Sequence, residues 1–273
     1  MTVAERIGVE IISADSGQVY RGLDIGTAKP TPEERRGIPY HLIDILNPDA
    51  IFSAEDFRRL AGEEIQNIQS RGKRVLVVGG TGLYLKALEG GLFEGPSRDP
   101  AVRDELEKRA REEGVESLKK ELASIDPKAA AQIPGNNRQR LIRALEVYRL
   151  TGRPISEHWE AHRKISPFTF QKIGINLPQE ELHRRIESRV DRMIAQGLVD
   201  EVRSLVQKWG ATAPALKIIG YKEIVAHLSG PTSLKEAVEW IKIHTRQYAK
   251  RQMTWFRKDK EIRWVSDFNK EIQ

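Results

Sequence analysis

VEIISADSGQVYRGLDIGTAKP, residues 9–30, is the stretch that decides the fold of this chain. It begins as an apolar run rich in β-branched residues and changes within a few positions to Asp, Ser, Gly and Gln, which predicts a buried strand that ends at the edge of a sheet. In open α/β sheets, ligands bind beyond the carboxyl ends of the strands. Asp15 is therefore a candidate functional acid, although an Asp that only caps the following turn explains the position equally well.

A second strand is predicted at residues 75–78, an apolar run that breaks into Gly79-Gly-Thr-Gly82 and continues as a helical pattern over residues 83–88. Glycines let the backbone approach an anion, and the turn amides with the Thr81 hydroxyl supply hydrogen-bond donors. The turn could therefore hold a phosphate, but a plain tight turn between strand and helix is at least as good an explanation.

The residues between these two strands complete an alternating pattern. A third short strand is expected near residues 39–45, and a helix should begin at the capping box formed by Ser53 and Asp56 and end near Gln69. Because alternating strands and helices are typical of βαβ units, the sequence predicts an α/β fold with a mainly parallel sheet.

The composition limits the classes of protein that fit this chain. It has 273 residues, 39% of them hydrophobic and 31% charged, so we expect one large α/β domain or a domain with an insertion. No apolar run approaches the ~18 residues of a membrane span, and the first residues lack the apolar segment of a secretory signal, which favours a cytoplasmic location. The chain has no Cys, which excludes thiolate metal sites, and its net charge of +6 suits a polyanionic partner.

A helical insertion is predicted between the two parts of the core. Residues 101–150 are almost entirely helical in pattern, with breaks at Gly114, Asp126-Pro127 and Pro134-Gly135. We expect residues 1–96 and 166–273 to form the α/β core and residues 97–165 to form the insertion. Within the insertion, one helix has polar side chains that could grip phosphates or bases, although solvated charges are the commoner explanation. These side chains belong to Arg138, Gln139, Arg140 and Arg143.

Two later stretches are rich in cations. Lys217 and Lys222 flank Gly220, a residue that permits a close approach of the backbone, so these lysines could face an anionic leaving group, although ordinary surface lysines are the commoner explanation. Residues 245–258 interleave cations with aromatic residues at helical spacing. Such cations can hold a nucleic-acid backbone while aromatics stack on bases, but the pattern alone favours core positions for the aromatic residues. These are Tyr248, Trp255 and Phe256.

Taken together, six stretches resemble one family, the bacterial tRNA dimethylallyltransferases, also called tRNA isopentenyltransferases. They are ISADSGQVYRGLDIGTAKP, VVGGTGLYLKAL, NNRQRLIRALEVYRLTGRPIS, RIESRVDRMIAQGLVDEV, IGYKE and TRQYAKRQMTWFRK. The resemblance covers essentially the whole chain in the family's order. It implies a P-loop NTPase-like parallel-sheet core with a helical insertion domain that helps to hold the anticodon stem-loop.

The resemblance also implies a reaction and roles for particular residues. A dimethylallyl group moves from dimethylallyl diphosphate to the exocyclic amine of the adenosine just 3′ of the anticodon, with magnesium assisting. Asp15 matches the family's general base. Thr81 matches a catalytic position that also binds diphosphate. Lys217 matches a second diphosphate-binding position, at which Arg is common in the family, and a Lys there offers a point charge in place of a bidentate guanidinium. The residues that match tRNA contacts are Asp15, Ser16, Gly17, Gln18, Gln139, Arg140, Leu141, Ile142, Arg143, Arg246, Lys250 and Arg251.

The start of the chain departs from the family pattern. The family begins with a strand and a phosphate loop of the type GPTxxGK[ST], and GxxxxGK[ST] occurs nowhere in this sequence. We therefore expect either an N-terminal truncation or a degenerate relative, with an exposed sheet edge and impaired catalysis. Two other functions stay open, an adenylate isopentenyltransferase and an RNA-binding relative without catalysis. The helical insertion and the basic C-terminal helix argue against the first of these. A monomer is expected.

Overall fold

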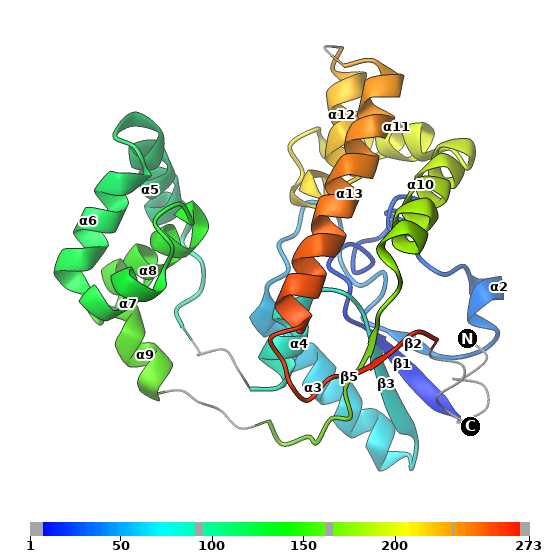
Figure 1. Cartoon of the computed structure of the whole chain (residues 1–273), viewed down its shortest axis with the longest axis horizontal. Coiled ribbons are helices and arrows are strands. Elements are labelled where there is room, and N and C mark those ends of the chain that lie inside the picture. Colours follow the sequence, from blue (N-terminus) through cyan, green and yellow to red (C-terminus); the bar gives the residue numbers. More distant parts are fainter. Residues whose placement is uncertain (1–7, 91–94, 162–165, 231, 268–273) are drawn as a thin grey trace. The chain divides into compact units, whose positions relative to one another are not determined.

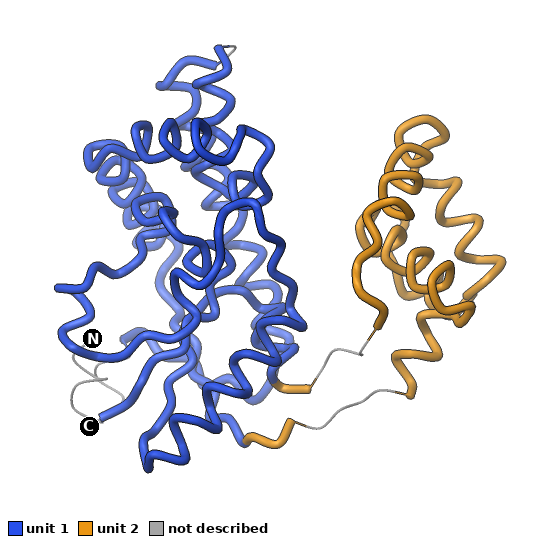
Figure 2. The backbone as a smooth tube through the Cα atoms, turned by 180° about the vertical axis from the view of Figure 1, so that it is seen from behind, with its two compact units in different colours: residues 1–88, 169–273 blue, residues 89–168 orange. Residues whose placement is uncertain are grey.

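A computed structural model describes residues 8–90, 95–161, 166–230 and 232–267 of the chain. The chain divides into two compact units (Figure 2): unit 1 comprises residues 1–88 and 169–273, and unit 2 comprises residues 89–168. The insertion that the sequence places at residues 97–165 lies inside unit 2. None of the helices within the described ranges is both long enough and apolar enough to cross a membrane.

A three-stranded parallel sheet in unit 1 contains the stretch on which the fold depends. Strand β1 (Val9–Ser13) lies between β2 (Tyr40–His41) and β3 (Arg74–Val78), in the order β2-β1-β3 (Figure 1). All of β1 is buried, and the predicted parallel sheet is confirmed. Strand β2 is shorter than predicted because Leu42 and Asp44 have φ angles of 58° and 57°, which interrupt the extended backbone.

Three helices follow these strands. Helix α2 (Pro32–Arg35) lies between β1 and β2 in the chain, α3 (Ala54–Ser70) lies between β2 and β3, and α4 (Gly82–Leu88) follows β3. The predicted capping box of α3 is confirmed, because Ser53 Oγ accepts from the Asp56 amide and the Asp56 carboxylate accepts from the Ser53 amide. The rings of Phe57 and Tyr84 stack at 4.6 Å and join α3 to α4.

The second part of unit 1 adds a small sheet and a layer of helices. Strands β4 (Ile173–Ile175) and β5 (Arg263–Val265) form a separate parallel pair. The helices bury apolar faces against one another and against residues 19–23, which form a hydrophobic core with them. They are α10 (Gln179–Ala195), α11 (Leu198–Trp209), the 3₁₀ helix η1 (Pro214–Lys217), α12 (Tyr221–Leu228) and α13 (Leu234–Phe256).

Unit 2 is helical and has its own hydrophobic core. Its predicted breaks at Gly114, Asp126-Pro127 and Pro134-Gly135 separate successive helices. The fully buried Glu146 carboxylate accepts from Arg103 Nε at 2.8 Å and from Arg143 at 2.7 Å, so its charge is compensated inside the unit. The helices are α5 (Pro100–Glu112), α6 (Val115–Ile125), α7 (Pro127–Gln132), α8 (Arg138–Thr151) and α9 (Ile155–Ala161).

Candidate active site

Asp15 lies just beyond the carboxyl end of β1 and is partly exposed. Its Oδ1 accepts hydrogen bonds from the backbone amides of Gly17 at 2.8 Å and Gln18 at 3.2 Å. Its Oδ2 has no hydrogen-bond partner within the part of the chain that the structure describes. The two interpretations of Asp15 are therefore compatible, since one oxygen shapes the turn and the other is available to a ligand.

Thr81 reaches the same turn from the end of β3. Its Oγ1 accepts from the Ser16 amide at 3.2 Å, and its own amide donates to Ala14 O at 3.3 Å. A Cβ at Gly79 would lie only 2.2 Å from that same carbonyl oxygen, so the glycine is required by packing. Protein contacts thus fix the Gly-Gly-Thr-Gly turn and place the Thr81 hydroxyl beside the Asp15 turn.

The second half of α13 packs against this turn. Gln252 Nε2 and the Tyr248 hydroxyl donate to Gly80 O at 2.9 and 3.4 Å. Partial burial, reinforced by the negative charge of Asp15, raises the pKa of Tyr248. The Tyr248 hydroxyl therefore stays protonated at neutral pH and remains a hydrogen-bond donor near Asp15.

Arg189 of α10 is a cation near Asp15 that the sequence analysis missed. Its guanidinium donates to Thr27 O at 3.1 Å. Loss of hydration lowers the pKa of Arg189, and the negative charge of Asp15 acts in the opposite direction. The sequence gives no local signal for this role, because the same helix also carries Arg184, Arg185 and Arg192.

A carboxylate from α11 anchors the loop that follows Asp15. Glu201 Oε2 accepts from the amides of Asp24 at 3.2 Å and Ile25 at 2.8 Å, and Oε1 accepts from the Gly26 amide at 3.3 Å and the Tyr221 hydroxyl at 2.6 Å. A Cβ at Gly26 would lie 2.4 Å from the Tyr221 ring. The loop is thus held against α11 and α12 at a position where only glycine fits.

Lys29 anchors the far end of this loop. Its Nζ donates to Tyr20 O at 2.8 Å and forms ion pairs of 2.6 Å with both Asp24 and Asp44. The Lys29 side chain is 3% exposed, so its charge is compensated in a largely dry position. Glu201 and Lys29 together give the loop one defined conformation.

The residues next to Asp15 have different surroundings. Gln18 turns inward, where its Oε1 accepts from Ser13 Oγ at 3.0 Å and its Nε2 lies 3.4 Å from Thr27 O. A Cβ at Gly17 would lie 2.7 Å from the Thr27 methyl group, so this glycine is required by packing. Ser16 is partly exposed beside Asp15.

Lys217 ends η1 and is exposed, with no ion pair to the residues in the described ranges. The next residue, Ile218, places its Cδ1 3.0 Å from the position that a Cβ of Gly17 would take. The end of η1 therefore lies beside the Asp15 turn, which brings Lys217 into its neighbourhood.

The predicted tRNA-contacting segment of α8 lies in unit 2 and divides into exposed and buried residues. Gln139 and Arg140 are exposed, while Arg143 is half-buried in its ion pair with Glu146. Leu141 and Ile142 are 0% and 1% exposed in the core of unit 2. Their side chains pack in that core and not on the surface of unit 2, and the assignment of these two residues as tRNA contacts stays a prediction.

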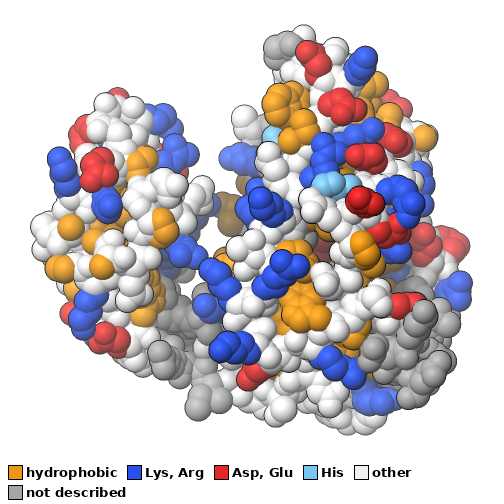
Figure 3. Space-filling view, in the orientation of Figure 1, with side chains coloured by type: hydrophobic (Ala, Val, Ile, Leu, Met, Phe, Trp, Pro, Cys, Tyr) orange, Lys and Arg blue, Asp and Glu red, His pale blue; other side chains and the backbone are white. Residues whose placement is uncertain are grey.

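The cations of α13 lie on the surface of unit 1. Lys250 and Arg251 are exposed, and Arg246 forms an ion pair of 3.1 Å with Glu187. Lys and Arg side chains gather over the second half of α13 in Figure 3, where a concavity of about 480 Å³ is lined by three cations and Trp255. Charge and an aromatic surface are therefore available together on this helix.

The aromatic residues of α13 do not lie in the core, contrary to the prediction from the pattern. Tyr248 is 37% exposed, with the Arg251 guanidinium 5.7 Å from its ring centre, and Trp255 and Phe256 are partly exposed. Tyr248 and Trp255 follow Ile241 in steps of seven residues and so continue the helix side that buries Ala237 and Ile241. In the second half of α13, however, this side meets the turn at Gly80 and Gly82 and not the helical core.

Fold and site together define an α/β transferase with a P-loop NTPase-like core. Asp15 lies beyond the central strand of a parallel sheet, and the turn with Thr81 lies beyond the neighbouring strand β3. A separate helical unit interrupts the sequence of this core. The family model described as IPP transferase matches residues 18–259, which is most of the chain. The chain belongs to the IPP transferase family.

Individual relatives agree with this assignment. The chain is 56% identical to the tRNA dimethylallyltransferase of Geobacter metallireducens over 97% of its own length and 86% of that protein. The crystal structure of the tRNA isopentenylpyrophosphate transferase from Bacillus halodurans matches with 43% identity and a TM-score of 0.71, covering 99% of this chain and 87% of that one. A eukaryotic dimethylallyltransferase captured acting on tRNA matches with 29% identity and a TM-score of 0.77, over 93% and 65% of the two chains.

Proposed function

We propose that this chain transfers a dimethylallyl group from dimethylallyl diphosphate to the exocyclic amine of the adenosine immediately 3′ of the anticodon in tRNA, and releases diphosphate. The observation that carries the proposal is the environment of Asp15. Two backbone amides hold one of its carboxylate oxygens, and the other oxygen faces no protein partner within the described ranges. The names of the relatives, which are tRNA dimethylallyltransferases and tRNA isopentenylpyrophosphate transferases, support the reaction class and the tRNA acceptor.

Asp15 supplies the base in this proposal. The amine of adenine is a weak nucleophile, so its proton must leave as the new bond forms between nitrogen and the allylic carbon. Asp15 takes that proton while the bond between the allylic carbon and the diphosphate oxygen breaks. The adenine must leave the base stack to reach Asp15, which costs a few kcal/mol that contacts elsewhere on the RNA offset.

The diphosphate side of the proposal uses Thr81 and Lys217, with Arg189 as an addition from the structure. The Thr81 hydroxyl can donate to a phosphate oxygen while it accepts from the Ser16 amide. Arg189 and the exposed Lys217 are cations near the Asp15 turn. Both can compensate the charge that develops on the leaving diphosphate.

Magnesium is the metal that we expect with a diphosphate donor. Within the described ranges, no three His, Asp or Glu side chains lie close enough together to hold a metal ion. Magnesium keeps several waters and commonly binds through substrate phosphates with one or two carboxylates, so a dedicated protein cage is not required. When bound, it would neutralise diphosphate charge.

We propose that tRNA contacts polar residues of both units that are exposed or partly exposed. In unit 2 these are Gln139, Arg140 and, if its ion pair opens, Arg143; in unit 1 they are Ser16, Arg246, Lys250 and Arg251. The basic residues would neutralise phosphates of the stem-loop, so affinity should fall as salt rises. A cytoplasmic location is part of the same proposal, because its acceptor is tRNA, and we propose that the protein is a monomer.

The test is an isosteric change at the base. Asp15→Asn keeps an oxygen that can accept from the Gly17 and Gln18 amides but removes the basic carboxylate. We expect prenyl transfer to fall by about 10²- to 10⁴-fold, while affinity for an anticodon stem-loop stays within about twofold. Transfer at the wild-type rate by this variant would remove Asp15 as the base. Inhibition by AMP in competition with the stem-loop would favour an adenylate isopentenyltransferase instead.

A further inference from the structure

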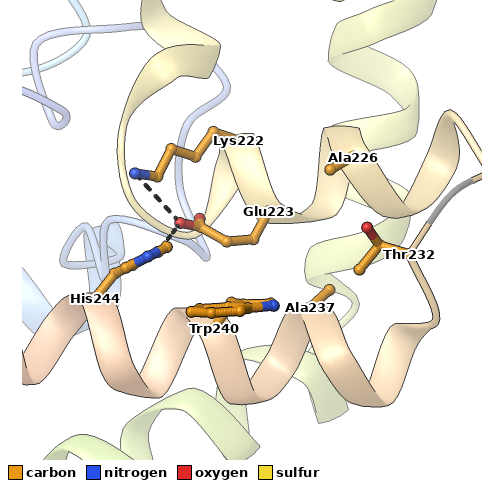
Figure 4. Close-up of a pocket in the computed structure, with 7 residues that line it drawn as sticks. All are labelled: Lys222, Glu223, Ala226, Thr232, Ala237, Trp240 and His244. Carbon is orange, nitrogen blue, oxygen red and sulfur yellow. Dashed lines mark hydrogen bonds and ion pairs between the residues drawn. The ribbon is translucent and has the colours of Figure 1, made fainter.

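A second surface site lies in unit 1 between α12 and the first half of α13. A cavity of about 340 Å³ opens there (Figure 4). Trp240 and His244 line it from α13, and Lys222, Glu223 and Ala226 line it from α12. None of these residues takes part in the Asp15 site described above.

Trp240 presents an unusually exposed aromatic surface. Its side chain is 50% exposed, although a Trp can bury a large apolar area. The indole stacks on the His244 ring, with centroids 5.5 Å apart and planes inclined by 25°. The indole, with the imidazole stacked on it, therefore presents a flat aromatic platform at the cavity.

A buried carboxylate fixes this platform. His244 Nδ1 donates to Glu223 Oε1 at 2.6 Å, and Glu223 is only 6% exposed. Glu223 Oε2 accepts from the Gly220 amide at 2.7 Å, and Lys222 Nζ lies 3.5 Å from Oε1. The rings are thus held in place before any ligand arrives, which lowers the entropic cost of binding.

The platform lies on the same helix as the residues beside Asp15. Trp240, His244, Tyr248 and Gln252 are spaced by four residues, so they follow one side of α13. Trp240 and Tyr248 are therefore separated by about 12 Å along the axis. That distance corresponds to about three or four nucleotides stacked at ~3.4 Å each.

We propose that the Trp240 platform binds an unpaired nucleobase of the RNA acceptor, a few nucleotides away from the base that enters the Asp15 site. The base stacks on the indole, and the exposed Lys222 ammonium contacts an adjacent phosphate. This inference rests on the proposed function, because it takes the acceptor to be RNA. Stacking on an aromatic side chain contributes about 1 to 3 kcal/mol for each base.

The first experiment compares three variants of the full chain for their affinity to an anticodon stem-loop. Trp240→Ala should weaken binding by about 5- to 150-fold. Trp240→Phe keeps an aromatic ring and should retain most of the affinity. Leu234→Ala is the matched control, because Leu234 lies on the same helix, is 36% exposed and is outside the cavity. It should bind like the wild type, and thermal midpoints identify any loss of folding.

A second experiment identifies the base. Stem-loops with one abasic nucleotide at each loop position are titrated against the wild type and Trp240→Ala. One position should weaken binding to the wild type and leave binding to Trp240→Ala unchanged, as expected if ring and base interact directly. An equal effect on both proteins at every position would overturn the inference.

The remaining outcomes separate this inference from the proposed function. If Trp240→Ala binds and prenylates the stem-loop like the wild type, the platform has no role and the inference is wrong, while the proposed function stands. If free AMP binds the wild type but not Trp240→Ala and the stem-loop series shows no dependence on Trp240, the occupant is a free nucleotide and the RNA assignment is overturned. If the wild type neither binds nor prenylates the stem-loop, both proposals fail.

Discussion

Glu201→Gln is the substitution that tests most directly how the loop after Asp15 is held. The carboxylate accepts four hydrogen bonds, two at each oxygen. A Gln can keep its oxygen toward the amides of Asp24 and Ile25, but its NH₂ group then faces the Gly26 amide and the Tyr221 hydroxyl. The hydroxyl can rotate and accept a hydrogen bond, whereas the Gly26 N–H cannot.

The size of the effect follows from these contacts. Leaving a partly buried N–H without an acceptor costs about 1 to 3 kcal/mol, and hydrogen bonds to a neutral oxygen are weaker than those to a carboxylate. Because Glu201 is only partly buried, we expect a loss of about 2 to 3 kcal/mol in the free energy of unfolding of unit 1. For a domain of this size, that corresponds to a fall of about 4 to 12 °C in Tm.

The assay combines stability with a local probe. Thermal unfolding gives the change in Tm, and hydrogen exchange reports the protection of the Asp24, Ile25 and Gly26 amides. Glu239→Gln is the matched control, because Glu239 is 58% exposed and lies 3.7 Å from Lys242, so its loss should change Tm by less than about 1 °C. Unchanged protection of the three amides and an unchanged Tm in Glu201→Gln would refute the reasoning.

Two further predictions concern β1 and its neighbouring turn. Arg71 and then His41 lower the pKa of the buried Glu10 to about 2, so Glu10 stabilises the fold above its unfolded pKa near 4.5, and this stabilisation is lost as pH falls from 4.5 toward 2. Glu10→Gln should flatten the dependence of Tm on pH in that window, and an unaltered pH dependence would contradict the assignment. Gly79→Ala should destabilise unit 1 by about 3 kcal/mol, because its Cβ would meet backbone atoms. A fall in Tm no larger than that of Gly135→Ala, whose Cβ would meet only the flexible Lys119 side chain, would disprove the packing argument.

Several boundaries of the fold were predictable because short-range interactions decide them. The capping box at Ser53 and Asp56 and the helix breaks at Gly114 and Asp126 involve residues within one helical turn. The apolar run of β1 and the polar residues after it also placed Asp15 beyond a buried strand. The early end of β2 was not predictable, because Leu42, whose φ angle lies in the left-handed region, belongs to a sequence pattern that is typical of a strand.

The sequence by itself determined the order of strands and helices, the position of Asp15 and, through six stretches in order, the resemblance to tRNA dimethylallyltransferases. Tertiary structure alone decided which distant side chains hold the loop that follows this acid: Arg189 contacts Thr27 and Glu201 contacts Ile25, each more than a hundred residues away in the sequence. It also decided that Trp240 is exposed, whereas Leu141 is buried. The physical reason is that hydrogen bonds and hydrophobic periodicity within a helix or strand depend on near neighbours, while contacts between helices depend on how whole faces pack.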